Sequence, residues 1–167
     1  MDSIEIQYYN TQLGELSIGS FEGKLCLLDF KHRKTRDTLD NRLQNNLHTN
    51  FVKKNNDILE KTKIQIHEYL SGTRKEFTIP LLTVGTSFQK EVWEVVAQIG
   101  YGDTASYLDI AKKIKRESAV RAVANAIGAN AVALIIPCHR VVGANKKLGG
   151  YAGGTLAKNT LLELEKN

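Results

Sequence analysis

The spacing of hydrophobic residues changes once along this chain, near residue 81, and that change constrains the fold more than any other feature. Apolar and polar residues alternate over residues 4–30, where Gly14 and the segment from Gly19 to Gly23 separate three short runs. Such alternation is typical of half-buried strands, so we expect a β-meander. After residue 85 the apolar residues recur with the period of a helix. The sequence therefore predicts a sheet first and helices second.

The rest of the first half is expected to add a helix and a last strand. Residues 36–56 are polar and rich in asparagine, and they carry only weak helical signals. Asp57–Ser71 is a stronger candidate for a helix, because one face gathers Leu59, Thr62, Ile66, Tyr69 and Leu70. Lys75–Pro80 is typical of a strand and residues 81–85 of a linker. We therefore expect one subdomain over residues 1–81 and another over residues 82–167.

Three helices are predicted after the linker. Thr86 with Gln89, and Ser106 with Asp109, fit the capping box, in which two side chains satisfy free amides at a helix start. We interpret Trp93, beside the apolar stripe of the first helix, as a core residue. The third helix places apolar residues at positions i, i+3, i+4 and i+7, namely Val120, Val123, Ala124 and Ile127. Two short helices joined by the turn at 115–118 are typical of a helix-turn-helix.

The other face of the third helix is polar at two points and otherwise nearly flat. Arg121 and Asn125 share it with small residues, which are Ala122, Ala126 and Gly128. The preceding basic residues form an edge that could lie along a phosphate backbone, namely Lys112, Lys113, Lys115 and Arg116. Residues 82–167 hold 11 basic and 7 acidic residues of a chain whose net charge is +5, which favours an anionic partner. A solvated helix with a small-residue surface is the alternative.

The stretch from Ala133 to Gly143 carries the candidate chemistry. An apolar run that is typical of a buried strand ends at Pro137, and Cys138, His139 and Arg140 follow at once. We predict that Cys138 is a nucleophile. If the segment is extended, its neighbour His139 points to the opposite side, so a bridging water is the expected link between thiol and base. For Cys26, inside an apolar run, we expect a buried hydrophobe without chemistry.

The two cysteines also limit cofactors and compartment. They lie far apart and form no C-x-x-C pair, so we expect no zinc site, no disulfide and no cofactor. A reducing compartment is expected. The first residues lack the profile of a signal peptide, and no apolar run has the length of a membrane span, so we expect a soluble, intracellular protein.

Several of these residues occur in the order and spacing of a known family. They are Tyr107, the Arg121–Val123 start of the third helix, Asn130, the run Pro137–Val142, the segment Gly150–Gly154 and Glu165. From Thr86 to Glu165 the chain resembles the O6-alkylguanine-DNA alkyltransferases. The resemblance implies an α/β (α+β) fold, with a ribonuclease-H-like N-terminal subdomain and a helical C-terminal subdomain that contains a helix-turn-helix. Gly100 and Ala131 stand where the family usually has proline.

The resemblance implies a reaction and a role for each residue that matches the family motif. An alkyl group moves from O6 of guanine, or less readily from O4 of thymine, to Cys138, and the protein is consumed. His139 acts as the base through a water, and Glu165 orients it. Tyr107 donates to N3 of the base. The main-chain carbonyls of Cys138 and Val141 take the exocyclic amine, and an amide near Tyr151 and Ala152 faces O6.

The resemblance also implies how DNA is bound. The partner is double-stranded DNA that contains O6-alkylguanine, bound without sequence preference through the minor groove, with the damaged nucleotide flipped out. Arg121 enters the stack in its place, and Asn130 ties the turn after the helix to the active segment. We also expect Ala122, Asn125 and Arg140 to contact DNA or substrate. The protein is expected to be a monomer that does not bind membranes, cytoplasmic and nucleoid-associated in a prokaryote or nuclear in a eukaryote.

Two other functions remain open at this point. One is a module that recognises alkylated bases without transfer, which the presence of Cys138 argues against. The other is a thiol hydrolase that uses Cys138, His139 and Glu165 for acyl transfer. It would require an oxyanion hole and a histidine in direct reach of the thiol, and it leaves Arg121 unexplained.

Overall fold

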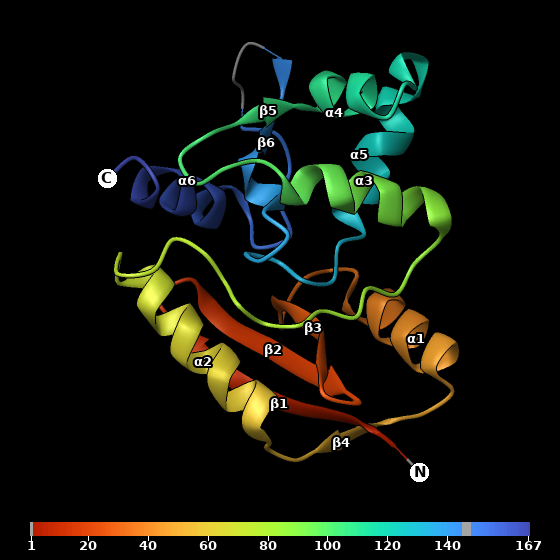
Figure 1. Ribbon diagram of the computed structural model, residues 1–167, viewed down its shortest axis with the longest axis vertical. Coiled ribbons are helices and arrows are strands. Elements are labelled where there is room, and N and C mark those ends of the chain that lie inside the picture. Colours follow the sequence, from red (N-terminus) through yellow and green to blue (C-terminus); the bar gives the residue numbers. More distant parts are fainter. Residues whose placement is uncertain (1, 145–147) are drawn as a thin grey trace. The chain divides into compact units, whose positions relative to one another are not determined.

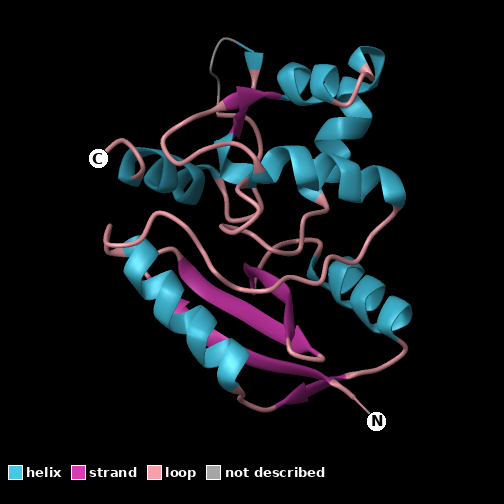
Figure 2. Cartoon of the chain, viewed as in Figure 1, coloured by secondary structure: helices cyan, strands magenta, loops and turns pink. Residues whose placement is uncertain are grey.

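The computed structural model describes residues 2–144 and 148–167 (Figure 1). The chain forms two compact units, Met1–Val84 and Gly85–Asn167, so the division lies three residues beyond the one expected from the sequence. The fold is mixed α/β, with the main sheet in the first unit and most helices in the second (Figure 2). Within the described residues, no helix is long and apolar enough to span a membrane.

The first unit is built on the predicted meander. Strands β1 (Ile4–Thr11), β2 (Gly14–Phe21) and β3 (Lys24–Phe30) pair antiparallel in chain order, which confirms the prediction. The turns between them contain Gly14 and Gly23, whose φ angles of 114° and 78° favour glycine. A short strand that the sequence did not predict, β4 (Phe51–Lys53), pairs parallel with β1 and gives the sheet order β3-β2-β1-β4.

Two helices accompany this sheet. Helix α2 (Asp57–Leu70) confirms the predicted helix, and its five expected face residues are all buried. It packs against β1 and β2 and begins where the Asn56 side chain accepts a hydrogen bond from the Leu59 amide, 2.9 Å away (Figure 1). Helix α1 (Arg36–Leu47) forms in the asparagine-rich segment, which carries only weak helical signals. Its two buried leucines explain its stability better than local propensity does, because the rest of its sequence is polar.

The strand predicted at Lys75–Pro80 is wrong. The segment touches the edge of β3 through a single parallel bridge between Leu25 and Leu81. Leu25 donates to the Pro80 carbonyl and Leu82 donates to the Leu25 carbonyl, each at 2.9 Å. Pro80 has no amide hydrogen, so the segment cannot extend a regular ladder at this point.

The second unit contains helices α3 (Ser87–Ala97), α4 (Tyr107–Lys113), α5 (Val120–Gly128) and α6 (Thr155–Leu164). Both predicted capping boxes are present, at Thr86 and at Ser106. The short helix η1 (Glu117–Ala119) lies between α4 and α5, where a turn was expected. Trp93 is buried as predicted, and its Nε1 donates to the Ala126 carbonyl on α5 at 2.8 Å. Packing of α3 and α4 on α5 therefore fixes the helix that carries Arg121.

The buried strand predicted before Pro137 is also wrong. Residues 132–136 are mostly buried, but they form tight turns, in which Ile136 donates to the Val132 carbonyl at 3.0 Å. Leu134 has a φ of 68°, which a strand does not allow. Cys138, His139 and Arg140 then form the 3-10 helix η2 rather than an extended segment, and strand β6 (Val141–Val142) pairs with β5 (Ala105–Ser106). The argument from extended geometry about Cys138 and His139 therefore does not apply.

Candidate active site

Cys138 begins η2 and is held from the side of α5 by Asn130. The residue is 8% exposed, and Asn130 Nδ2 lies 3.4 Å from Cys138 Sγ. The same amide donates to the Ile136 carbonyl at 3.0 Å, and its Oδ1 accepts from the Val132 amide at 2.9 Å. Asn130 thus joins the end of α5 to the turns before Cys138. An N–H group directed at the sulfur stabilises negative charge there.

His139 and Glu165 form a buried pair in the same unit. His139 is fully buried, and its Nε2 lies 2.8 Å from Oε2 of Glu165, the residue that follows α6. Burial lowers the pKa of His139, and the charges of Arg140 and Lys158 lower it further, while Glu165 opposes them. The imidazole is therefore neutral near pH 7 and able to accept a proton.

Arg140 points at Glu165 and not at a surface. Its Nε donates to Oε1 at 2.8 Å and its Nη2 to Oε2 at 2.9 Å, which is a two-pronged contact. Nη1 donates to the Ile99 carbonyl at 2.6 Å, and the residue is 7% exposed. The structure thus places Arg140 with His139 and Glu165, apart from the exposed residues of α5 with which the sequence analysis grouped it as a DNA contact.

Tyr107 begins α4, and the charge of Cys138 acts on its hydroxyl group. Burial, followed by the charge of Cys138, raises the pKa of Tyr107. The phenol is therefore protonated at neutral pH and can donate its hydrogen. Gly149 passes against it with a φ of 69°, and a Cβ at Gly149 would lie 3.0 Å from the Tyr107 hydroxyl. A side chain at this position would be strained by the positive φ and would crowd the Tyr107 hydroxyl.

Lys158 is a site residue that the sequence analysis missed. It is fully buried on α6, and its Nζ donates to the Val141 carbonyl at 2.6 Å and to the Gly150 carbonyl at 3.2 Å. Burial lowers the pKa of Lys158 to about 8, and the charge of Cys138 opposes this shift. The only sequence signal was the spacing of Ala157 and Leu161, which flank Lys158 on the buried face of α6, because lysine itself is usually exposed.

The remaining predicted residues lie in two places. Val141 is buried in β6, while Tyr151 and Ala152 are partly exposed. The rings of His139 and Tyr151 meet edge to face, with their centroids 6.4 Å apart. The other group, Arg121, Ala122 and Asn125, is exposed on α5.

One residue of the flat face was misplaced. Ala126 was expected on this exposed face but is buried, because it lies on the side of α5 that receives Trp93. The expected basic edge is exposed, namely Lys112, Lys113, Lys115 and Arg116.

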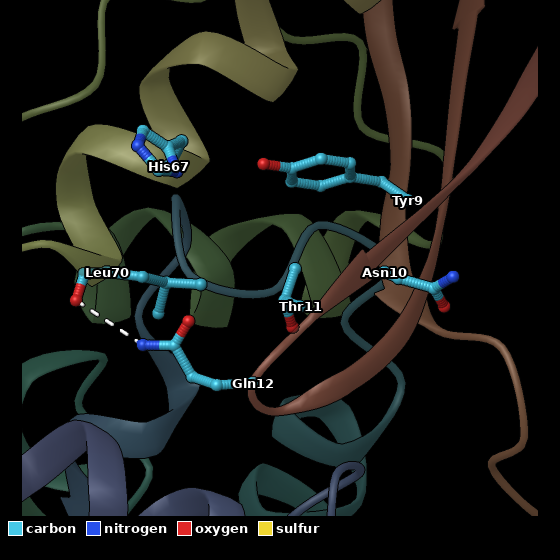
Figure 3. A pocket seen from close by; sticks show the side chains of 6 residues that line it. All are labelled: Tyr9, Asn10, Thr11, Gln12, His67 and Leu70. Atoms are coloured by element: carbon cyan, nitrogen blue, oxygen red, sulfur yellow. Dashed lines mark hydrogen bonds between the residues drawn. The ribbon is translucent and has the colours of Figure 1, made fainter.

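The cavity shown in Figure 3 and the arrangement of metal-binding residue types both bear on where the site lies. In residues 2–144 and 148–167, no three His, Cys, Asp or Glu side chains gather as a metal site would require. A cavity of about 270 Å³ in the first unit is lined by Tyr9, Asn10, Thr11, Gln12, His67 and Leu70 (Figure 3). The candidate site instead combines residues of the second unit alone.

Comparison with known proteins identifies both units. Residues 87–167 match the family model "6-O-methylguanine DNA methyltransferase, DNA binding domain", and residues 4–83 match "6-O-methylguanine DNA methyltransferase, ribonuclease-like domain". The fold resembles the crystal structure of Mycobacterium tuberculosis OGT in complex with DNA, with a TM-score of 0.82 and 34% identity. That similarity covers 97% of this chain and 92% of the other.

Two relatives from Bacillus subtilis extend the comparison. The inducible methylated-DNA–protein-cysteine methyltransferase is 52% identical over 110 residues, which are 66% of this chain and 62% of that protein. The match thus spans less than two thirds of that relative. The constitutive enzyme is 39% identical over 165 residues, with 96% of each chain covered. These matches confirm the family expected from the sequence: the chain belongs to the methylated-DNA–protein-cysteine methyltransferases.

Proposed function

We propose that this protein repairs DNA by moving an alkyl group from O6 of guanine, and less readily from O4 of thymine, to Cys138. The observation that carries the proposal is the arrangement around the sulfur: the Asn130 amide lies 3.4 Å from Sγ, and the next residue is a buried, neutral histidine paired with Glu165. A thiolate is the reactive form of cysteine, so a nearby base and N–H donor favour attack. The sulfur ends as a thioether, and each molecule acts once.

The residues divide the proton transfers between them. His139 removes the Cys138 proton through a bridging water, the sulfur forms a bond to the alkyl carbon, and the bond from that carbon to O6 breaks. The electron pair of the broken bond passes to the guanine. Tyr107 donates its hydroxyl hydrogen to N3; its pKa is raised by burial, so the phenol is protonated at neutral pH. Charge is conserved in the site, because His139 ends protonated, Tyr107 ends as a phenolate, and the guanine leaves as the neutral base.

Main-chain groups hold the purine. We assign the carbonyls of Cys138 and Val141 to the exocyclic amine and an amide near Tyr151 and Ala152 to O6. Lys158 already donates to the Val141 carbonyl, but a carbonyl oxygen has two lone pairs and can accept a second hydrogen bond. The proposed transfer needs no cofactor.

Double-stranded DNA is the proposed partner, and α5 is the proposed contact. Arg121, Ala122 and Asn125 are exposed on this helix, whose flat surface suits a minor groove. Arg121 would occupy the place of the flipped nucleotide, whose extrusion costs a few kcal/mol. Contacts to phosphate and to groove shape carry no base preference, so binding is sequence-independent. Residues 82–167 form the DNA-binding and alkyl-transfer subdomain, and residues 1–81 the ribonuclease-H-like subdomain.

The site of action follows from the substrate. A protein that repairs chromosomal DNA works where that DNA is, in the cytoplasm on the nucleoid of a prokaryote or in the nucleus of a eukaryote. We expect a monomer.

Intact-mass measurement after incubation with a duplex that contains O6-methylguanine tests the proposal. We expect a gain of one methylene on Cys138 and stoichiometric loss of the lesion. A recognition module would bind the duplex without gaining mass, and a thiol hydrolase would turn over an activated ester and leave the duplex unchanged. Either result would end the proposal.

Arg121→Ala tests the role of α5 separately. This variant should slow repair in a duplex about tenfold or more and leave transfer from free O6-benzylguanine within twofold, because the free base needs no extrusion. Equal slowing with both substrates would remove Arg121 from the DNA-binding role.

A further inference from the structure

Arg140 binds both carboxylate oxygens of Glu165 and is itself held by a backbone carbonyl. Two of its nitrogens donate to the two carboxylate oxygens at 2.8 and 2.9 Å, and the third donates to the Ile99 carbonyl at 2.6 Å. Both side chains are buried, and Arg140 also lies over the Tyr101 ring, 5.7 Å from its centroid. A guanidinium only donates hydrogen bonds, so this contact fixes both oxygens of Glu165 as acceptors and keeps the carboxylate ionised.

The contact between Arg140 and Glu165 determines which nitrogen of His139 can act as the base. Oε2 of Glu165 accepts from Arg140 Nη2 and also lies 2.8 Å from His139 Nε2. An ionised carboxylate has no hydrogen to donate, so Nε2 must carry the proton in the neutral ring. The lone pair is then on Nδ1. The tautomer of His139 thus follows from the charge state that Arg140 imposes on Glu165.

The same contact limits how strongly Glu165 attracts a proton to the ring. Alone, a buried carboxylate at 2.8 Å would stabilise the imidazolium. Arg140 shares that carboxylate and places a permanent positive charge beside the ring. Among the described residues, Lys158 and Glu165 of the α6 segment also act on His139, and the Tyr151 ring meets its ring edge to face. Ile99, which lies two residues after α3, acts through Arg140, because its carbonyl accepts a hydrogen bond from Arg140 Nη1.

We propose that Arg140 is a positioning residue for alkyl transfer: it holds Glu165 ionised and oriented, so that His139 keeps its Nε2 hydrogen and presents Nδ1 as the base. The inference rests on the proposed function of Cys138. It gives Arg140 a role inside the site in place of the DNA contact expected from the sequence.

The pH dependence of transfer from free O6-benzylguanine tests this role without DNA. Arg140→Met should raise the pKa of His139, because it removes a positive charge and leaves Glu165 unshared. The low-pH limb of the rate profile should therefore move up by about one pH unit, with about tenfold slower transfer on that limb and nearly wild-type rates near pH 9. Arg140→Lys, which keeps the charge but loses the fork, should shift the limb less.

Arg33→Met is the matched control. Arg33 also donates to a buried carboxylate, Asp29, but in the first unit. Its loss should lower stability without moving the rate profile. If Arg140→Met lowers the rate equally at every pH, as a purely structural residue would, the proposal is wrong.

Nitrogen-15 NMR of the four histidines provides a test that needs no variant to fold. The wild-type His139 ring should show the hydrogen on Nε2, and a hydrogen on Nδ1 would overturn the proposal. This measurement also separates the two hypotheses. If Cys138 is never alkylated, the proposed function fails while the tautomer still tests Arg140; if Cys138 is alkylated and the tautomer is reversed, only the role of Arg140 fails.

Discussion

Each unit of this protein buries one carboxylate that arginine holds, and the two carboxylates differ in their second partner. In the first unit, Asp29 receives Arg33 at 2.9 Å and Arg36 at 3.1 Å, both permanently charged. In the second, Glu165 receives Arg140 and His139. Two fixed cations make a contact that only supports the fold. Replacing one of them by a titratable ring leaves a proton that can move.

The two buried cysteines differ in a parallel way. Cys26 is 1% exposed in β3 and its Sγ lies 3.6 Å from the Gly19 carbonyl, a partner that accepts hydrogen from a thiol. Burial raises the pKa of Cys26 to about 12, so it stays a thiol. Cys138 is slightly more exposed and faces the Asn130 amide, which donates. If Cys138 is the reactive thiol, as we propose, the sign of the neighbouring dipole distinguishes it from Cys26 better than burial does.

The strongest test of this contrast removes each thiol in turn. Cys138→Ala should abolish alkyl transfer completely while DNA binding persists, because no other group takes the alkyl carbon. Cys26→Ala should transfer at the wild-type rate once corrected for folded fraction. Intact mass after reaction with lesion-containing duplex measures both. Any alkyl gain by Cys138→Ala would break the comparison.

Substitution of the two buried carboxylates should have the next largest effect. Glu165→Gln should slow transfer about 100-fold at neutral pH, because the base loses its orienting partner. Asp29→Asn should instead cost about 3 kcal/mol of unfolding free energy, since Arg33 and Arg36, both partly buried, lose the fully buried carboxylate that they share. Urea unfolding and single-turnover rates of the folded protein separate the effects. A slow but fully stable Asp29→Asn variant would contradict the division of roles.

Two asparagines allow a finer comparison. Asn130 binds the turns before Cys138, and Asn56 caps α2 and donates to Glu5 and Ser20 at 2.8 and 2.7 Å. Either Asn→Ala change should cost about 1–3 kcal/mol, because buried partners lose their hydrogen bonds. Only Asn130→Ala should also slow transfer by the folded protein. Equal rates in the two variants would show that the Asn130 contact to sulfur is not needed.

Lys158 gives the smallest effect, visible only in alkaline solution. Its pKa is about 8 in the folded chain and about 10.5 in the unfolded chain, so between these values the unfolded state binds more protons. Stability should therefore rise with pH from about 8 to 10, by roughly 1–2 kcal/mol, relative to the variant Lys158→Met. Denaturant unfolding at a series of pH values measures the difference. A constant difference would mean that Lys158 has an ordinary pKa when folded.

The sequence predicted what local chemistry decides. The meander, α2, both capping boxes and the buried Trp93 follow from spacing and from side chains a few residues apart. The sequence missed what distant contacts decide. Helix α1 depends on two buried leucines in a polar segment, and β4 is three residues long and pairs with β1, far away in the chain.

The candidate site divides along the same line. The motif placed Cys138 beside His139 and matched Glu165, but the direction of Arg140 and the burial of Lys158 were not predictable from their residue types, which are usually exposed. The apolar run before Pro137 was taken for a strand because periodicity cannot distinguish buried turns from a buried strand.

The single tryptophan of the chain has a practical consequence. Trp93 is enclosed in the second unit with its indole N–H bonded to the backbone of α5, whereas the six tyrosines are spread over both units. Its emission therefore reports the environment of the helix that carries Arg121, free of any signal from another indole. Red-shifted fluorescence during denaturation would mark the moment at which water reaches that helix, and far-ultraviolet circular dichroism would follow the whole chain.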